Sequence, residues 1–242
     1  MLQIDILTLF PDSMAAVLGE SIIGNGIKKG YLSIDFHQIR DYTLSKQARV
    51  DDAPYGGGMG MLMQADPLYR AHKAVCKMRG KEHIHTIYLS AQGQVYNQKT
   101  ARRLATLDNF ILVCGHYEGI DQRFIDECVD EEISLGDFVL TGGEIPALAV
   151  ADSVGRLLPG VLADESCFTD ESHWSGLLEY PHFTRPEVWN GRAVPEVLLS
   201  GNHEKIRKWR RREALLATRA KRPDLWAKFT PTKEDVKLLE EE

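Results

Sequence analysis

The sequence predicts an α/β protein whose core is a parallel sheet. Apolar, strand-like runs alternate with helical patterns through residues 1–158, the order expected when crossover helices connect parallel strands. The run at residues 110–114 is wholly apolar, which is typical of a strand buried on both faces. Glycine-rich loops follow three of the runs, and loops at the carboxyl ends of parallel strands converge on a ligand site.

Alternating and apolar patterns predict the strands. Ile4 and Ile6 share one side of the first, and short strand fragments are expected at Ile133 and at residues 138–140. The four full strands are expected at residues 2–9, 33–40, 83–89 and 110–114.

Capping residues and apolar spacing predict the helices. The first follows a turn at residues 10–13 that suits an N-terminal cap. Pro67 suits the first position of the second helix, and Asn97 caps the third. These helices are expected at residues 13–18, 66–78, 98–107, 121–128 and 143–158.

Composition narrows the class of protein. The chain has 242 residues, 43% hydrophobic and 26% charged, which suits one large or two small globular domains. No run is long enough to span a bilayer and no signal peptide is evident, so we expect a cytoplasmic protein without membrane contact. The four scattered cysteines predict free thiols. His83 and His85 share a strand face but lack a third ligand nearby, so no metal site is expected.

A second domain is expected beyond residue 160. Residues 162–174 are acidic and weakly patterned, as in a linker that is disordered alone. We therefore expect three parts: an α/β domain at 1–160, a flexible linker at 161–175 and a small, mostly helical domain at 176–242.

One helix of this second domain, expected at residues 203–220, carries a dense positive charge. Residues 205–222 hold nine basic residues and one acid, in a chain whose net charge is −6. Such a cluster favours phosphate binding, although a solvated charged face is the common alternative. The apolar stripe that would face the core consists of Ile206, Trp209, Leu216 and Ala220.

The stretch at residues 49–61 is too glycine-rich for a helix or strand. Met61 occupies the position where G-x-G-x-x-G needs its last glycine, and the chain has no G-x-x-x-x-G-K-[ST], so neither a dinucleotide fingerprint nor a P-loop is present. Two interpretations stay open. One is a flexible surface loop, and the other is a mobile loop that closes over a bulky, planar substrate group.

Three further glycine-rich loops, at residues 88–93, 113–119 and 134–146, each follow an apolar run. Glycine lets the backbone approach a ligand closely and present its own amides and carbonyls. Any one of these loops could be a plain strand-to-helix connection. Their shared position after strands predicts one common ligand site.

The chain contains the motifs Tyr-Gly-Gly-Gly-Met-Gly-Met, Cys-Gly-His-Tyr-Glu-Gly-Ile-Asp and Gly-Leu-Leu-Glu-Tyr-Pro-His-Phe-Thr-Arg-Pro. With several shorter stretches, they resemble the bacterial tRNA (guanine-N1-)-methyltransferases, the TrmD family of the SPOUT superfamily. In order, the matching stretches are residues 8–11, 55–61, 88–90, 114–121, 134–146, 176–186 and 198–203.

The resemblance implies methylation of N1 of the guanosine immediately 3′ of the tRNA anticodon, guanosine-37, with S-adenosylmethionine as the methyl donor. It also implies a deep trefoil knot in the α/β domain and a homodimer with sites at the subunit interface. General rules of topology argue against a knot. Neither the need for Mg²⁺ nor the preferred tRNA isoacceptors follow from the sequence, and no other protein partner is implied.

The resemblance places the methyl donor among residues of the three loops. These are Tyr88, Leu89, Ser90, Gly93, Gly115, Tyr117, Glu118, Gly119, Leu135, Gly136, Asp137, Phe138, Val139, Leu140, Gly142, Gly143 and Pro146. The residues expected to contact RNA are Gly57, Gly58, Met59, His182, Arg185, Arg207, Lys208 and Arg211.

The catalytic assignment contains one departure from the family. Its arginine matches Arg156, but its aspartate, in an Asp-Ser pair, falls on Glu171 and Ser172, with Asp170 one residue away. A carboxylate here would remove the guanine N1 proton and the arginine would stabilise charge on O6. Which of the two acids acts is open. Apart from the resemblance, Arg156 fits a surface or ion-pair role, and the acids fit a solvated linker.

Two other functions compete with methyl transfer. A non-catalytic RNA-binding protein could keep the same fold, and donor binding measured by calorimetry would separate the two. A nicotinamide-dependent oxidoreductase on a doubly wound sheet would need the G-x-G-x-x-G that the chain lacks.

Overall fold

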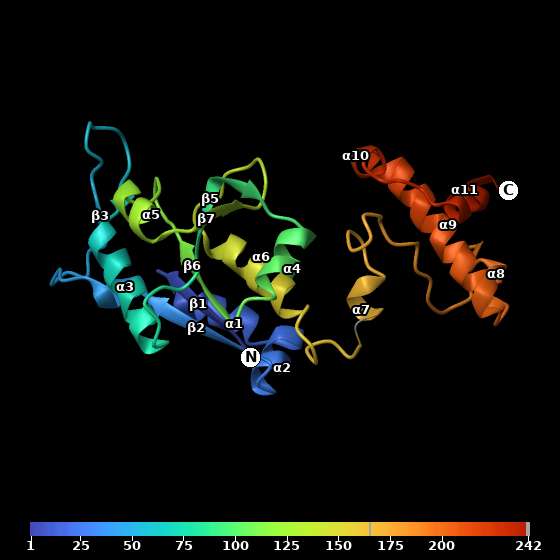
Figure 1. Cartoon of the computed structure of the whole chain (residues 1–242), viewed down its shortest axis with the longest axis horizontal. Helices are drawn as coiled ribbons and strands as arrows, with labels where there is room; N and C mark the ends of the chain where they lie inside the picture. Colours follow the sequence, from blue (N-terminus) through green and yellow to red (C-terminus); the bar gives the residue numbers. More distant parts are fainter. Residues whose placement is uncertain (165, 241–242) are drawn as a thin grey trace. The chain divides into compact units, whose positions relative to one another are not determined.

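A computed structural model describes residues 1–164 and 166–240, which form two compact units, Met1–Ala163 and Asp164–Glu242 (Figure 1). Glu165, within the expected linker, and Glu241 and Glu242, at the expected end of the helical domain, lie outside the described residues. Residues 166–175 group with the second unit, and their flexibility as a linker stays a prediction.

The first unit is an α/β fold on a five-stranded sheet in which all neighbouring strands are parallel, as predicted. The strand order is β2-β1-β6-β5-β7. The central β6 is buried at every position. Helices therefore cover both faces of the sheet. The strands are β1 (Leu2–Thr8), β2 (Leu32–Gln38), β5 (Thr86–Val95), β6 (Asn109–Cys114) and β7 (Glu131–Ser134).

The helices of the first unit form two layers (Figure 1). Helices α3 and α5 pack against each other over a core that includes Leu7, Met63 and Phe124. Helices α1, α2 and α4 all contact α6. The bounds are α1 (Pro11–Leu18), α2 (Ser21–Lys28), α3 (Ala65–Met78), α4 (Gln98–Leu104), α5 (Gln122–Cys128) and α6 (Glu144–Gly155), with the 3-10 helix η1 (Ile39–Tyr42) and the hairpin β3 (Asp51–Asp52) and β4 (Leu62–Met63).

Two predicted strands differ from the structure. Strand β5 begins at Thr86, where pairing with β6 starts, rather than at His83. His83 and His85 precede it and contact acids, with His83 Nε2 2.9 Å from Asp130 Oδ2 and His85 Nε2 2.7 Å from Glu131 Oε1. Residues 138–140 are loop, with Val139 86% exposed, since no neighbouring strand pairs with them.

The helix predictions also need correction. Helix α2 was not expected, because glycine disfavours helix and Gly24 and Gly26 lie within it. Packing outweighs that cost, since a Cβ on Gly24 would lie 2.0 Å from the Gly19 carbonyl oxygen and one on Gly26 would lie 2.8 Å from the Leu32 side chain. Helix α1 begins at Pro11 without a side-chain cap, and Pro67 is the third residue of α3.

A buried ionic network ties β1, β2 and α3 together. Asp5 is fully buried, and its carboxylate lies 2.7 Å from His37 Nε2 and accepts hydrogen bonds from Arg79 at 2.8 and 2.9 Å. Arg79 also binds Asp35 at 2.5 Å. Burial alone would raise the pKa of Asp5, but its hydrogen bonds with His37 and Arg79 outweigh burial, so the net pKa lies below the usual value.

The second unit is mostly helical and centred on α9, which contacts α8, α10 and α11. Asn202 caps α9 by accepting a hydrogen bond from the Lys205 amide at 3.1 Å. The buried residues of α9 are Ala214, Leu215 and Thr218, whereas Ala220, expected in the core, is exposed. The elements are α7 (Ser166–Thr169), β8 (Val188–Trp189), β9 (Arg192–Ala193), α8 (Glu196–Leu199), α9 (His203–Lys221), α10 (Pro223–Trp226) and α11 (Lys233–Glu240).

Two general predictions can be compared with the fold. All four cysteines are free thiols, and Cys76, Cys114 and Cys128 are buried. Among the described residues, no helix has the length and apolar character that crossing a membrane requires.

Candidate functional site

The loops after β5, β6 and β7 surround one cavity in the first unit. These strands are neighbours in the order β6-β5-β7, so their carboxyl ends meet at one edge of the sheet. Fourteen of the seventeen residues predicted to contact the methyl donor line the cavity; Gly93, Gly136 and Asp137 do not. The sequence did not single out six other lining residues, which are Ala91, Gln92, His116, Ile133, Ser134 and Thr141.

The glycines of the cavity wall are required by close packing. A Cβ on Gly115 would lie 2.8 Å from the ring of Tyr88, and one on Gly143 would lie 2.7 Å from Cys114 Cα. A Cβ on Gly142 would lie 2.7 Å from His116 Nδ1. All three distances are shorter than a van der Waals contact of a Cβ atom, so no side chain fits at these positions and backbone atoms form this part of the cavity wall. Gly93 serves the sheet instead, because its Cβ would lie 2.4 Å from the backbone of Glu132.

Backbone hydrogen bonds hold the second and third loops together. The Gly143 amide donates to the Gly115 carbonyl at 2.8 Å, and His116 and Gly142 form an isolated β-bridge. Ser134 Oγ accepts a hydrogen bond from the Gly136 amide at 3.1 Å. Tyr117 has a φ of 60°, which is unusual for a residue with a side chain. Contacts of the chain with itself therefore hold the cavity wall in place.

Hydrogen bonds of Thr8 connect the end of β1 to the start of α6, next to the cavity wall. Thr8, at the end of β1, donates a hydrogen bond to Glu144 Oε1 at 3.0 Å and accepts one from the Phe10 amide at 3.0 Å. Glu144 lies in the first turn of α6, where the helix dipole favours a negative charge. Burial, and then the charge of Glu144, raise the pKa of the Cys114 thiol well above its usual value. The thiol is thus neutral and acts as a packing group.

His116 is the most notable residue that the sequence did not single out. Its ring packs against Phe10 at 5.3 Å and Tyr117 at 5.0 Å between centroids. Its Nδ1 is buried and has no hydrogen-bond partner among the described residues. Its position inside the motif around Gly115 was the available signal. Tyr88, across the cavity, has a pKa raised to about 12 by burial and then by the charge of Glu132, so it stays neutral.

The glycine-rich loop between β3 and β4 is anchored at one end to this site. The Glu118 amide donates to the Met61 carbonyl and the Met63 amide donates to the Gly119 carbonyl, both at 3.0 Å. A Cβ on Gly60 would lie 2.4 Å from Glu118 Cγ. The predicted RNA-contacting residues Gly57, Gly58 and Met59 form the exposed tip, which extends away from the sheet (Figure 1), and Met59 is 94% exposed.

The three predicted catalytic residues belong to different units. Arg156 follows α6 in the first unit and is half-buried, and its amide donates to the Asp152 carbonyl at 3.0 Å. Asp170 is exposed after α7 in the second unit, and Glu171 beside it is half-buried. Their joint action stays a prediction. Within the described part of the chain, no cluster of three or more His, Cys, Asp or Glu side chains could hold a metal ion.

The predicted RNA-contacting residues of α9 are engaged by acids from outside the basic cluster. Arg207 lies 3.2 Å from Glu204 and 3.3 Å from Glu234, and Lys208 lies 3.6 Å from Glu204. All of these are exposed pairs, which hold their partners weakly. The sequence could not reveal the pairing with Glu234, because Glu234 comes from a different helix, α11, whereas Glu204 lies in α9 three and four residues before Arg207 and Lys208.

Arg211 differs from these two residues. It makes two hydrogen bonds, at 2.7 and 3.0 Å, to Asp235, whose side chain is 2% exposed. The bonds from Arg211 lower the pKa of Asp235 to about 2. Arg211 therefore joins α9 to α11.

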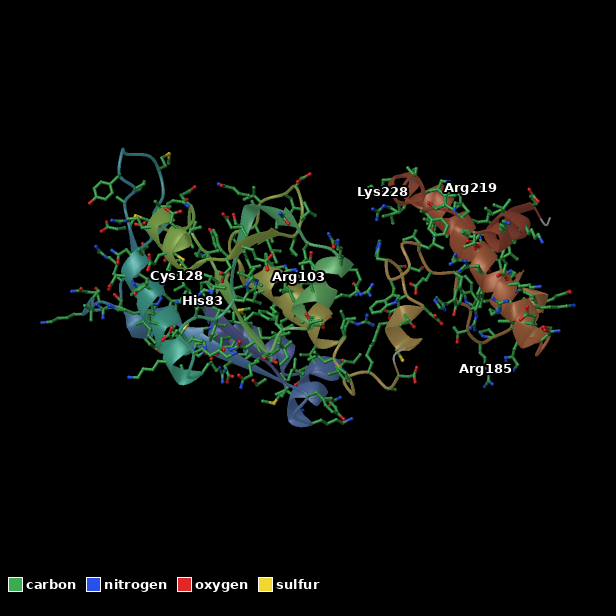
Figure 2. The ribbon with its side chains drawn as sticks, in the orientation of Figure 1. His83, Arg103, Cys128, Arg185, Arg219 and Lys228 are labelled. Carbon is green, nitrogen blue, oxygen red and sulfur yellow. The ribbon has the colours of Figure 1, made fainter. Side chains whose placement is uncertain are left out.

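The remaining predicted RNA contacts lie outside α9. His182 is exposed, with Nε2 3.5 Å from Glu179, and Arg185 is exposed and extends away from the ribbon (Figure 2). Within residues 1–164 and 166–240, the exposed lysines and arginines of α9 without an ion-pair partner are Lys205, Arg210, Arg219 and Lys221. The Arg210 guanidinium lies 4.8 Å from the centre of the Tyr180 ring.

Comparison with known proteins identifies the family of the chain. A family model described as tRNA (Guanine-1)-methyltransferase TrmD matches residues 2–228. A tRNA (guanine-N(1)-)-methyltransferase of Ruminiclostridium cellulolyticum is 52% identical over 94% of this chain and 97% of its own length. One of Clostridium perfringens is 53% identical over 98% and 99%, and one of Alkaliphilus oremlandii is 49% identical over 98% and 97%. These three relatives cover 94–98% of the chain, so the likeness extends over both units, and the chain belongs to the TrmD family of tRNA (guanine-1)-methyltransferases.

Proposed function

We propose that this protein transfers a methyl group from S-adenosylmethionine to N1 of the guanosine immediately 3′ of the tRNA anticodon, guanosine-37. One observation carries the proposal: in a chain of the TrmD family, three glycine-rich loops at the ends of neighbouring strands enclose a single cavity. A tRNA substrate implies that the reaction takes place in the cytoplasm.

The cavity fits a methyl donor with an adenine ring and a charged tail. Gly115, Gly142 and Gly143 leave backbone at its wall, so amides and carbonyls can bind the edges of a planar base. Leu89, Leu140 and Pro146 add apolar surface on which such a ring packs. When bound, S-adenosylmethionine supplies a methyl group already activated by its sulfonium charge.

The chain must supply the proton chemistry of the acceptor. Guanine N1 carries a proton and is a poor nucleophile until that proton leaves. We assign proton removal to Glu171, with Asp170 as the alternative, a step worth roughly 10²–10⁴-fold in rate. Arg156 would donate hydrogen bonds to guanine O6 as negative charge develops there. The target base lies in a stacked loop, so it must be flipped out to reach these groups.

RNA binding is assigned to exposed basic residues of α9 and to the exposed loop tip at residues 57–59. Arg207 and Lys208 are held only by exposed acids, which phosphates can replace. Lys205, Arg219 and Lys221 add positive charge on the same helix.

Two features of the proposal concern architecture. Phe138, Val139 and Ile145 are more than half exposed beside the cavity, which favours coverage by a second copy in a homodimer. Sedimentation of the purified chain tests this directly. A trefoil knot is also proposed, and its support is that the chain belongs to the TrmD family.

The activity is tested by mass spectrometry of an unmodified tRNA transcript incubated with the protein and S-adenosylmethionine. Nuclease fragments should show one added methyl group on the fragment that contains guanosine-37. A transcript with adenosine at that position is the control and should stay unmodified. Methylation of both transcripts, or of neither, would contradict the proposal.

A further inference from the structure

The hairpin formed by β8 and β9 is a self-contained part of the second unit. Its turn consists of Asn190 and Gly191, whose φ values of 49° and 75° are both left-handed. A two-residue turn of this kind matches the twist of antiparallel strands, and Asn-Gly is its favoured sequence. At the open end, the Val194 amide donates to the Glu187 carbonyl at 2.9 Å. The hairpin therefore holds its side chains in defined positions.

This hairpin presents large apolar side chains to solvent. Residues 181–193 are all exposed, and Trp189 and Val188 are 67% and 56% exposed. The other three tryptophans of the chain are half-buried. Tryptophan is the residue most enriched at energetically important contacts, so one displayed on a shaped hairpin indicates a binding surface.

The register decides which residues share a face. Trp189 pairs with Arg192 across the hairpin, so their side chains lie on the same face, and Val188 points to the opposite one. Arg185, also exposed, lies four residues before Trp189. Within the described residues, neither Arg185 nor Arg192 has an ion-pair partner. Glu187 is the one acid between residues 181 and 193.

We propose that Trp189 stacks on an unpaired base of the tRNA while Arg192 binds a neighbouring phosphate. The inference rests on the proposed function and adds a contact surface outside α9 and the donor cavity. Charge complementarity favours RNA over a protein partner, because an apolar protein surface would leave the two arginines unpaired. Aromatic stacking tolerates any base, so this contact adds affinity without choosing sequence.

Stacking can be observed directly by ¹⁹F NMR of the full chain labelled with 5-fluorotryptophan, with the Trp189 signal assigned from the Trp189→Phe variant. We expect this signal to shift on addition of unmodified tRNA transcript and to stay in place with a fully paired RNA duplex. An equal response to both RNAs, or to neither, would overturn the proposal.

Affinity measurements separate the roles of the two residues. Trp189→Ala should weaken tRNA binding roughly 5- to 150-fold without changing its salt dependence, and Trp189→Phe should restore most of the affinity. Arg192→Gln should reduce the salt slope by about one. Val188→Ala, on the opposite face, is the matched control and should bind as the wild type does.

Two outcomes distinguish this inference from the proposed function. If the wild-type protein methylates the transcript and the Trp189→Ala variant binds tRNA as tightly as the wild type does, the hairpin contact alone is overturned. A Trp189 signal that responds to tRNA in a protein that does not methylate would overturn the activity alone. If Trp189→Ala dissociates the proposed homodimer in the absence of RNA, the hairpin contacts the second copy of the chain, and the proposal is overturned.

Discussion

Gly142 shows how a single missing side chain shapes the cavity. Its φ lies outside the left-handed region, so another residue could adopt its backbone conformation. Crowding forbids a larger residue, because a Cβ would lie 2.7 Å from His116 Nδ1 and 3.3 Å from the Gly115 carbonyl oxygen. The requirement for glycine is thus one of space at the ligand-facing wall.

We therefore expect Gly142→Val to lower the affinity for S-adenosylmethionine by at least about tenfold, since the loop must shift away from the loop after β6. Calorimetric titration measures the affinity, and circular dichroism checks that the fold is intact. Wild-type affinity in a folded Gly142→Val protein would show that the donor binds elsewhere.

The identity of the general base is a second question at the scale of residues. We expect Glu171→Gln to lower the single-turnover rate by roughly 10²–10⁴-fold and to leave donor binding unchanged, because the loss is felt only as the N1 proton leaves. Higher pH should partly restore the rate, since N1 then ionises without help. Asp170→Asn is the matched control. A slow Asp170→Asn enzyme beside a normal Glu171→Gln enzyme would reverse the assignment.

At the scale of elements, α9 carries two kinds of arginine. Arg211 is held by the buried carboxylate of Asp235 and stabilises the contact between α9 and α11. Arg207 is held by Glu204 and Glu234 at the surface, where an ion pair contributes little stability. Arg207 and Arg211 lie four residues apart on α9, but we expect their mutations to have different effects.

We expect Arg211→Gln to destabilise the second unit by about 1–3 kcal/mol, because it leaves Asp235 buried without its cation. A paired Arg207→Gln and Lys208→Gln variant should keep its stability, but its tRNA binding should lose about one to two units of salt slope. Thermal unfolding and tRNA titration at several salt concentrations measure the two effects. A stable Arg211→Gln protein with impaired tRNA binding would assign Arg211 to the RNA surface instead.

At the scale of the whole molecule, each unit contains a buried aspartate that hydrogen bonds hold ionised, from His37 and Arg79 in the first unit and from Arg211 in the second. These are Asp5 in the first unit and Asp235 in the second. The pKa of each lies below its usual value in the folded state, and that of Asp235 is about 2. Their stabilising contribution is present above the unfolded pKa, near 4, and is lost as the pH falls through the folded value.

The second unit should therefore lose stability between about pH 4 and pH 2, and the first unit should lose stability as the pH falls below about 4. Unfolding temperatures measured across this range should fall for the wild type. Asp235→Asn should be less stable at neutral pH and should lose less on acidification, because asparagine does not titrate. An equally steep acid loss in Asp235→Asn would show that other carboxylates dominate.

Local patterns predicted the parallel sheet, because each strand carries its own apolar run and each helix its own spacing. The same patterns predicted the cavity, since carboxyl ends of neighbouring strands must meet. What the sequence did not reveal depends on partners far along the chain. Glu234 and Asp235 come from α11, and His83 is bound by Asp130, which follows α5. Helix α2 was missed because its glycines are selected by packing.

Strand β5 contains a further instructive feature. It leaves the sheet after Leu89 and returns at Gln94, and both residues pair with Ile133 of β7. The segment between them forms part of the cavity wall, yet its two ends are fixed by the same residue of a neighbouring strand. A residue inserted or deleted there would change the depth of the cavity while both halves of the strand kept their register. Ligand fit at this site can therefore diverge during evolution without any change in the pairing of β5 with β7.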